Sequence, residues 1–179
     1  GVGVKTEIGK LIREAMIRQS LTRTELVRKM GYGNISRGHL RLNDWCTGAR
    51  VPSGDQPQRI AQGCGVPLNE VVQAILADQH AAQQRRLARR AENPHFYVVM
   101  RLMPAVYPRE KLPLGTTEDT ALRFAQDKAK AMGRRCCLDS PDGTQTWVDE
   151  KGRVYGVSQD RTPTMRIGKK TFHFELSSL

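Results

Sequence analysis

This 179-residue sequence has no long apolar run, and none approaches the roughly 20 residues that a helix needs to cross a bilayer. The first residues, Gly1 to Val4, also show no charged segment followed by an apolar stretch, so they carry no recognisable secretory signal. We therefore expect a protein with no membrane partner and with a cytoplasmic location.

Cysteine is scarce, and the four that occur are never in a C-x-x-C spacing: Cys46, Cys64, Cys136 and Cys137. Because no nearby histidine completes a zinc-finger spacing either, we expect no metal site and no other cofactor. Cys46 and Cys64 fall in predicted helices, where a free thiol usually packs as a small hydrophobe. The adjacent Cys136 and Cys137 should alternate across a strand, with one thiol buried and one exposed.

Enzyme motifs are also missing, because the sequence has no nucleophile elbow, phosphate-cradling glycine loop or zinc-hydrolase motif. We therefore expect a protein that is not an enzyme. The alternative is a metal-dependent nuclease in which Asp142 and Asp149 hold Mg²⁺ and Lys151 assists the attacking water. Their spacing is short, and both strings are of the turn-forming kind that hairpins use without chemistry, which is the interpretation that we prefer.

Positive charge is abundant, with 29 Lys and Arg against 18 Asp and Glu and a formal net charge of +11. Such an excess favours polyanionic partners, and nucleic acid is the first of them. Residues 1–92 hold 15 of the basic residues and 8 of the acidic ones, so 7 of the 11 excess charges lie in the first half. The nucleic-acid partner is therefore expected to bind there.

The first 76 residues have the spacing of five short helices. Apolar residues recur at helical intervals from Glu7 to Gln19, which predicts the first helix. Thr22 with Glu25 forms a capping-box pattern, which opens a second helix that Gly31 ends.

The third helix is predicted to end at Gly48, and its core-facing residues share one helical stripe: Ile35, Gly38, Leu42 and Trp45. Asp55 can cap a fourth helix that Gly65 ends, and a fifth helix opens at Asn69. We therefore expect an all-α domain over residues 1–76.

The remaining sequence divides into a linker and a second domain. Residues 77–93 are rich in Ala, Gln and Arg with few core-forming residues, so they predict a basic helical linker that the Asn93-Pro94 step ends. Its arginine run, from Arg85 to Arg90, is expected to be solvated, with a phosphate-gripping arm as the alternative. Residues 94–179 combine a strand-like run, one amphipathic helix and frequent turn signals, which predict a small α+β domain with antiparallel strands.

Four segments of the first half carry a family resemblance: Leu21-Thr-Arg-Thr-Glu-Leu26, Gly31, Trp45 through Gly48-Ala-Arg-Val-Pro52, and Ile60-Ala61 through Gly65-Val66. With them, residues from about 8 to 76 resemble the Cro/CI-like (XRE-type) helix-turn-helix family. The resemblance implies a five-helix lambda-repressor-like fold whose third helix enters the major groove of double-stranded DNA. The sequence departs from the family at one place. The segment between Gly31 and Leu42 is several residues longer than the tight turn that is typical of the family.

The third helix should then be the recognition helix, with its polar side chains pointing outward. Residues near the N-terminus of such a helix reach base edges in the major groove, where arginine pairs with guanine. The base contacts that we expect come from four residues: Ser36, Arg37, His39 and Arg41. The phosphate contacts that we expect come from three more: Arg23, Asn43 and Arg50.

Together these features predict a sequence-specific, repressor-like transcriptional regulator that binds double-stranded DNA as a homodimer on paired half-sites. Residues 94–179 would then bind a small effector or a protein partner, or would serve dimerisation. Besides the nuclease, the alternative is an RNA-binding or protein-binding adaptor, because a basic protein can bind RNA through shape and phosphates.

Overall fold

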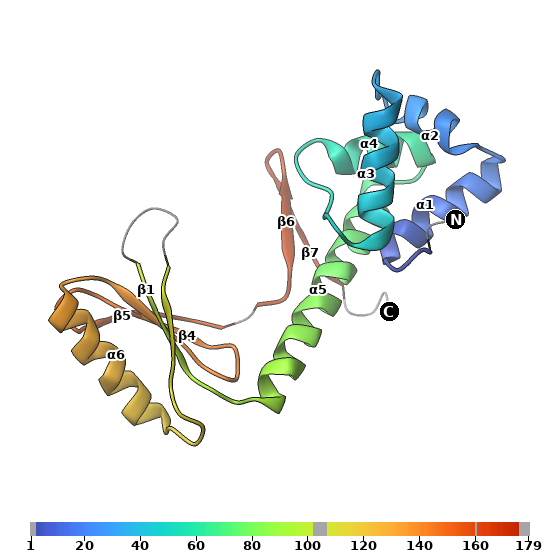
Figure 1. Ribbon diagram of the computed structural model, residues 1–179. Helices are drawn as coiled ribbons and strands as arrows, with labels where there is room; N and C mark the ends of the chain where they lie inside the picture. Colours follow the sequence, from blue (N-terminus) through green and yellow to red (C-terminus); the bar gives the residue numbers. More distant parts are fainter. Residues whose placement is uncertain (1–2, 102–106, 160, 176–179) are drawn as a thin grey trace. The chain divides into compact units, whose positions relative to one another are not determined.

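The computed structural model describes residues 3–101, 107–159 and 161–175. The chain divides into two compact units, and most of its helices and strands are labelled in Figure 1. The first unit comprises Gly1–Ala82 and Thr162–Leu179, and the second unit comprises Gln83–Arg161. Within the described ranges, no helix combines the length and the apolar character needed to span a membrane.

The first unit contains four whole helices, α1 (Glu7–Gln19), α2 (Arg23–Lys29), α3 (Ile35–Thr47) and α4 (Gln56–Cys64). It also contains residues 68–82 of a fifth helix, α5 (Leu68–Glu92). The capping box that opens α2 is confirmed, because Thr22 and Glu25 each accept a hydrogen bond from the other's backbone N–H. The Asn34 side chain caps α3 by accepting from Arg37 N at 3.0 Å. Gly48 ends α3 with a φ of 82°, a conformation that glycine adopts without strain.

One predicted cap is wrong. Asp55 stands at the N-cap position of α4, but its side chain makes no capping hydrogen bond. Instead, its Oδ2 accepts from Arg59 Nε at 2.9 Å. Pro57 lies in the first turn of α4 and has no N–H, so that turn offers one donor fewer to a cap.

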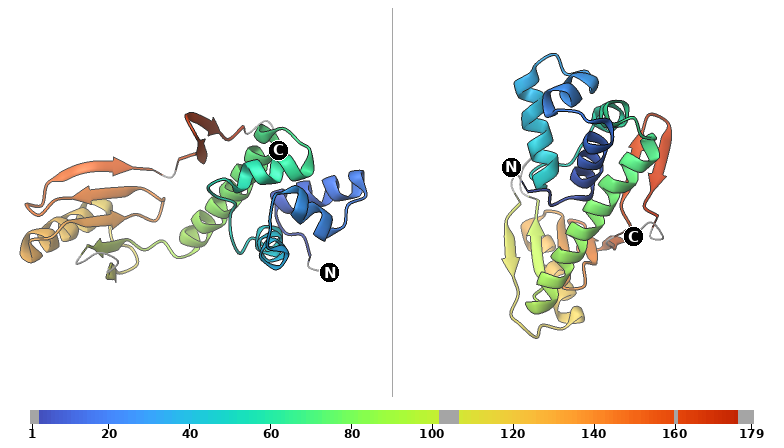
Figure 2. Two further views of the ribbon diagram at one scale, coloured as in Figure 1. Left: turned by 90° about the horizontal axis from the view of Figure 1, so that it is seen from above. Right: turned by 90° about the vertical axis from the view of Figure 1, so that its right-hand side faces the viewer.

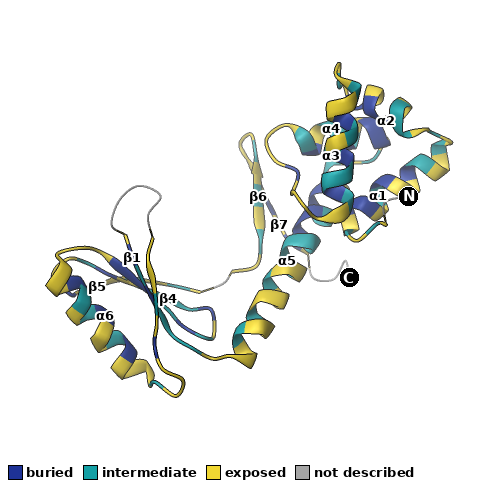
Figure 3. Cartoon of the chain, in the orientation of Figure 1, coloured by how far each residue is buried: buried dark blue, intermediate teal, exposed yellow. Residues whose placement is uncertain are grey.

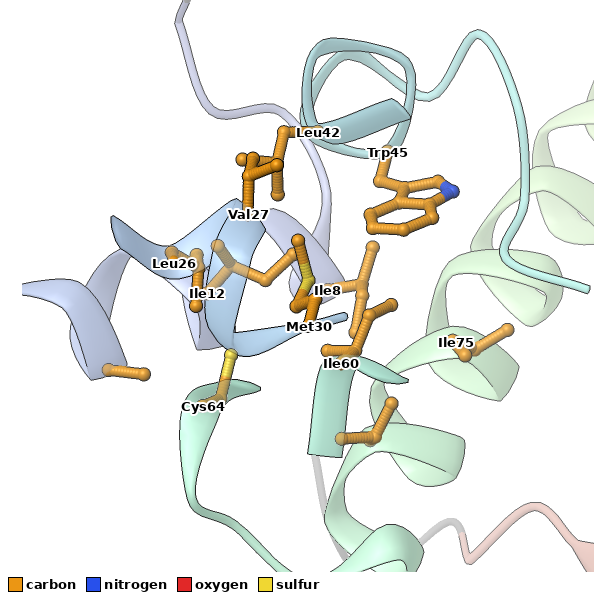
Figure 4. Close-up of a cluster of buried hydrophobic side chains, with 12 residues drawn as sticks. Ile8, Ile12, Leu26, Val27, Met30, Leu42, Trp45, Ile60, Cys64 and Ile75 are labelled. Atoms are coloured by element: carbon orange, nitrogen blue, oxygen red, sulfur yellow. The ribbon is translucent and has the colours of Figure 1, made fainter. Parts of the chain in front are cut away.

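The core of the first unit joins all five helices (Figure 4). Buried apolar side chains converge from each of them: Ile8, Ile12, Leu26, Val27, Leu42, Trp45, Ile60, Cys64 and Ile75. Two glycines, one in α3 and one in α4, allow these helices to lie close to α2 and to Met30, the residue that follows it. A Cβ atom added to Gly38 would lie 2.2 Å from Val27 Cγ1, and one added to Gly63 would lie 2.4 Å from Met30 Cγ.

A two-stranded antiparallel hairpin, formed by β6 (Thr164–Ile167) and β7 (Lys170–His173), also belongs to the first unit. Phe172 and Phe174 are buried with Val72 and Leu76 of α5. The contact is reinforced by Gln73, whose Nε2 donates to the His173 carbonyl at 2.8 Å.

The grouping of this hairpin differs from the predicted division, which assigned all of residues 94–179 to one domain. A two-stranded hairpin has too little apolar surface to be stable alone and needs a packing partner. Helix α5 supplies that partner. It is also longer than predicted, because the fifth helix and the expected helical linker at residues 77–93 form one continuous helix up to Glu92.

The second unit is an antiparallel sheet with one helix. Its strands are β1 (Tyr97–Met100), β2 (Arg109–Lys111), β3 (Cys136–Asp139), β4 (Gln145–Val148) and β5 (Val154–Ser158), in the order β2-β1-β3-β4-β5. Helix α6 (Glu118–Met132) joins β2 to β3 and covers one face of the sheet with three buried alanines: Ala121, Ala125 and Ala129. Figure 3 shows the buried side of α6 turned toward the strands. A helical N-terminal region and an α+β C-terminal region are thus both present, as predicted.

The two adjacent cysteines of β3 correct another prediction, because neither thiol is exposed. Cys136 faces α6, where its Sγ lies 3.3 Å from the Ala125 carbonyl oxygen. Cys137 points to the other face, where it pairs across the strands with Trp147 and is also buried. Burial raises the pKa of Cys136 to about 11 and that of Cys137 to about 12, so both thiols are neutral near pH 7.

Candidate nucleic-acid interface

Helix α3 has one buried and one exposed face, in the register that the sequence predicts. Gly38, Leu42 and Trp45 are buried, and Ile35 packs partly against them. Most residues between Gly31 and Leu42 are helical, since α3 begins directly after its Asn34 cap. The residues from Ile35 to Leu42 therefore belong to the helix and not to the loop that precedes it.

The first turns of α3 present exposed side chains to solvent. Ser36 and Arg37 are both exposed, and Leu40 is 57% exposed. Leu40 was not among the expected base contacts, although the spacing of the buried stripe places it on the outward side of the helix. Within the first unit, the β6–β7 hairpin lies on the other side of α5 from α3, so it leaves this face uncovered (Figure 2).

His39 connects α3 to α2 and is only half-buried. Its Nε2 lies 3.2 Å from the Thr24 hydroxyl oxygen, within hydrogen-bond distance. This contact fixes the imidazole at the edge of the α3 face and leaves the other ring nitrogen for a further partner. Sequence reasoning missed Thr24, because the pairing depends on how the two helices cross.

Two of the expected phosphate contacts lie together. The Arg23 guanidinium donates a hydrogen bond to Asn43 Oδ1 and thus links the start of α2 to the middle of α3. A guanidinium has five N–H donors, so this bond leaves Arg23 with others for an anion. Both residues are half-buried, at the edge of the exposed surface.

Arg41 and Arg50 converge on Asp44. The Asp44 Oδ2 atom lies 3.8 Å from Arg41 Nη1 and 3.6 Å from Arg50 Nε. Asp44 therefore offsets one of these two positive charges, and Arg50 is the more exposed of the two arginines. Residues 23–50 as a whole contain six Lys and Arg against two acidic residues, Glu25 and Asp44. This stretch thus keeps a clear positive excess.

Arg59 holds the segment that precedes α3. Its Nη1 donates to the carbonyl oxygens of Met30 at 3.2 Å and Gly31 at 2.9 Å. The guanidinium also lies 5.1 Å from the centroid of the Tyr32 ring, within cation–π range. Burial raises the pKa of Tyr32, so its hydroxyl stays protonated. No local sequence pattern predicts this arrangement, because α4 supplies the arginine from about thirty positions away.

The residues of the nuclease alternative are kept apart by the sheet. Asp142 lies in the turn between β3 and β4, whereas Asp149 and Lys151 lie in the turn between β4 and β5. These turns are at opposite ends of β4, whose four residues span ~13 Å. Two carboxylates at that separation do not share one metal ion. Among the described residues, no group of three His, Cys, Asp or Glu side chains is placed to hold a metal.

Both carboxylates instead stabilise their own turns. Asp142 Oδ1 accepts from Thr144 N at 2.9 Å. Asp149 Oδ1 accepts from Arg153 N at 2.8 Å and from Lys151 N at 2.9 Å, and these backbone hydrogen bonds lower the pKa of Asp149. Both carboxylates therefore have a role in turn formation.

Comparison of the chain with protein-family models, with curated proteins and with solved structures finds no match. A functional assignment therefore rests on the residues and geometry described above.

Proposed function

We propose that the first unit is a lambda-repressor-like helix-turn-helix domain of the Cro/CI type and that the protein is a repressor-like transcriptional regulator. In this proposal, α2 and α3 form the helix-turn-helix and α3 enters the major groove of double-stranded DNA. The observation that carries it is the two-sided character of α3. Its inner face is anchored by Gly38, Leu42 and Trp45, while Ser36 and Arg37 stand exposed at its N-terminal end.

The N-terminal end of α3 has the chemistry for reading base edges. Arg37 can donate two parallel hydrogen bonds to guanine, and the Ser36 hydroxyl can donate to or accept from several bases. Leu40, exposed one turn after them, suits an apolar contact with the thymine methyl group. His39 and Arg41 lie on either side of Leu40 in the sequence. The contact of His39 with Thr24 and the ion pair of Arg41 with Asp44 restrict their rotamers before DNA is bound.

The surrounding cations suit contacts with the DNA backbone. Arg50 is exposed just beyond the end of α3, and Arg23 with Asn43 lies at the junction of the two helices. Contacts to phosphate set the position of a helix in the groove without reading sequence. A single unit of this kind buries little DNA surface, so we propose that the protein binds as a homodimer on paired half-sites.

The experiment is selection of bound duplexes from a random pool, followed by titration of the selected site with the full chain. Arg37→Ala should lose preference at one base pair, whereas Arg18→Ala should not. Arg18 is a matched control because it is an exposed arginine of α1, near the Cys64 carbonyl. Failure of any selected duplex to outcompete random DNA would refute the proposal, as would stronger binding to RNA than to the selected duplex.

A further inference from the structure

The second unit has a sheet face that α6 does not cover. Strand register places Arg109, Val99, Cys137 and Trp147 side by side across this open face. Next to Trp147 is a hollow of about 330 Å³. Aromatic and polar side chains line most of it: Tyr107, Trp147, Tyr155, Arg101, Arg135 and Gln145.

The aromatic side chains of this hollow are unusually accessible. Tyr107 is 52% exposed, Trp147 is 38% exposed and Tyr155 is 53% exposed. The core of the unit lies on the other face of the sheet, between the strands and α6, and includes none of these three rings. A cluster of exposed rings in one place marks a binding surface more often than it contributes to the fold.

Guanidinium groups accompany the rings. The Arg135 guanidinium lies 5.4 Å from the centroid of the Tyr155 ring, and that of Arg109 lies 4.6 Å from the centroid of Tyr97. Arg101 lines the same hollow. These groups combine cation–π contacts with free donors, which is the combination that binds a base and its phosphate together.

Negative charge on this face is limited and already paired. Asp139 lies on the open face, where its two carboxylate oxygens accept from Arg90 at 2.9 Å and Arg109 at 3.3 Å. Glu150 pairs with Arg135 Nε at 3.1 Å from an exposed position. Beneath the rings, the buried Cys137 thiol stays neutral, because burial raises its pKa to about 12. An anionic ligand therefore meets more positive than negative charge here.

We infer that the open face of the β2-β1-β3-β4-β5 sheet binds single-stranded nucleic acid, with bases stacked on Trp147 and Tyr155 and phosphates held by Arg101 and Arg135. Unpaired bases can stack on exposed aromatic rings, whereas the bases of a duplex are enclosed by their own neighbours. Five strands about 4.8 Å apart give a platform ~20 Å wide, which is room for a few consecutive nucleotides. This activity is additional to duplex binding by α3 and uses other residues.

The test uses the full chain and the fluorescence of its two tryptophans. Trp45 is 1% exposed in the first unit, so quenching by a bound base should come from Trp147. Oligo(dT) and oligo(U) should each quench the fluorescence and bind. An abasic oligonucleotide with the same phosphates should bind at least several-fold more weakly and should not quench, because it has no base to stack.

Variants locate the site. Tyr155→Ala and Arg135→Gln should each weaken oligo(dT) binding on the order of tenfold, the usual effect of losing one stacked base or one phosphate contact. Phe124→Ala is the matched control, because Phe124 is an aromatic residue of α6 that is also 38% exposed but lies outside the hollow. Far-ultraviolet circular dichroism should show that each variant is folded, and Tyr155 and Arg135 are exposed enough to be replaced safely.

Single substitutions should affect duplex binding by α3 and oligo(dT) binding by the open face independently. Arg37→Ala should lose duplex preference and keep oligo(dT) binding, whereas Trp147→Ala should do the reverse. The inference is overturned if oligo(dT) and oligo(U) do not quench, if Phe124→Ala weakens binding as much as Tyr155→Ala, or if the abasic strand binds as tightly. Equal affinity for thymidine monophosphate and for oligo(dT) would also overturn it, in favour of a small-molecule site.

Discussion

In each unit a helix packs against a neighbouring element, and the residues at the contact differ between the two units. In the first unit, α3 approaches α2 through Gly38, where even one additional carbon atom would overlap Val27. In the second unit, α6 packs on the sheet through the methyl groups of three fully buried alanines. The glycine contact leaves no room for a side chain between α3 and α2, while the alanine contact is an ordinary apolar layer.

This difference in packing accompanies a difference in exposed chemistry. The outward face of α3 carries hydrogen-bonding groups on a narrow, convex rod, which suits the grooves of a duplex. The open face of the sheet carries rings on a broad surface, which suits unpaired bases. A helix that recognises bases through hydrogen bonds needs an accurate position relative to its neighbour, because a small shift moves every donor away from its base. The stacking of a base on an aromatic ring tolerates larger displacements.

The largest effect is expected from Gly38→Ala. The added Cβ would lie 2.2 Å from Val27 Cγ1, so the Val27 side chain or one of the two helices must move. Overpacking of this kind costs about 1–3 kcal/mol, and the gain in helix propensity of up to ~1 kcal/mol offsets only part of it. Denaturant unfolding followed by the fluorescence of buried Trp45 measures the loss, and binding to the selected duplex should fall as well.

A second substitution tests the cause. Val27→Ala removes the methyl groups that collide with the new Cβ, so Gly38→Ala should be less destabilising in a Val27→Ala background than in the original protein. A double-mutant cycle gives the coupling energy of the pair. Additive effects in that cycle would mean that Gly38 matters for another reason than its contact with Val27.

The next largest effect is expected from residues that contact DNA, and it should differ between a base contact and a phosphate contact. Arg37→Ala should cost about 1–3 kcal/mol on the preferred duplex and relax the preference at one base pair. Arg50→Ala should weaken binding to all duplexes about equally and reduce the slope of log affinity against log salt by about one unit. Fluorescence anisotropy at several salt concentrations separates the two patterns. Uniform losses for Arg37→Ala would place the reading residues elsewhere on α3.

Packing through alanines should change without displacing the neighbouring strands. Ala125→Gly removes one buried methyl group from the contact of α6 with the sheet, worth about 1 kcal/mol, and lowers helix propensity by about 1 kcal/mol. The expected loss is therefore about 2 kcal/mol, and hydrogen exchange of the β3 and β4 amides should detect it. A loss well above this sum would mean that α6 shifts on the sheet and would contradict the contrast between the two helix contacts.

The features that could be predicted from the sequence are those whose causes lie within a few residues. The Thr22–Glu25 capping box and the buried stripe of α3 depend only on local spacing, and both are confirmed. The exposure of Ser36 and Arg37 follows from the same stripe. The interpretation of the exposed face of α3 as a DNA-binding surface stays a prediction.

The features that were missed depend on contacts between distant segments. The β6–β7 hairpin follows the sheet strands in sequence but packs on α5, through pairs such as Gln73 and His173 that lie 100 positions apart. Cys137, which is paired in register with Trp147 of the neighbouring strand, is buried although it faces away from α6. Strand alternation alone places that thiol on the open face and gives no measure of what covers it there.

The smallest effect is expected at the turn between β4 and β5. Asp149 is half-buried, and the backbone N–H groups of Arg153 and Lys151 donate to its carboxylate and lower its pKa. Because the folded pKa is below the unfolded one, the stabilisation is complete above the unfolded pKa and is lost as the pH falls through the lowered folded pKa. Protection of the β4 and β5 amides against hydrogen exchange should therefore decline below about pH 4.

Two substitutions of Asp149 separate charge from hydrogen bonding. Asp149→Asn keeps an oxygen that can accept both backbone bonds, so protection at pH 7 should change little while its decline in acid becomes smaller. Asp149→Ala removes the acceptor and should lower protection at both pH values. An Asn variant with the full acid dependence would show that other carboxylates of the second unit govern it. Because the open face depends on β4 and β5 for Trp147 and Tyr155, oligo(dT) binding by these variants should follow the same order.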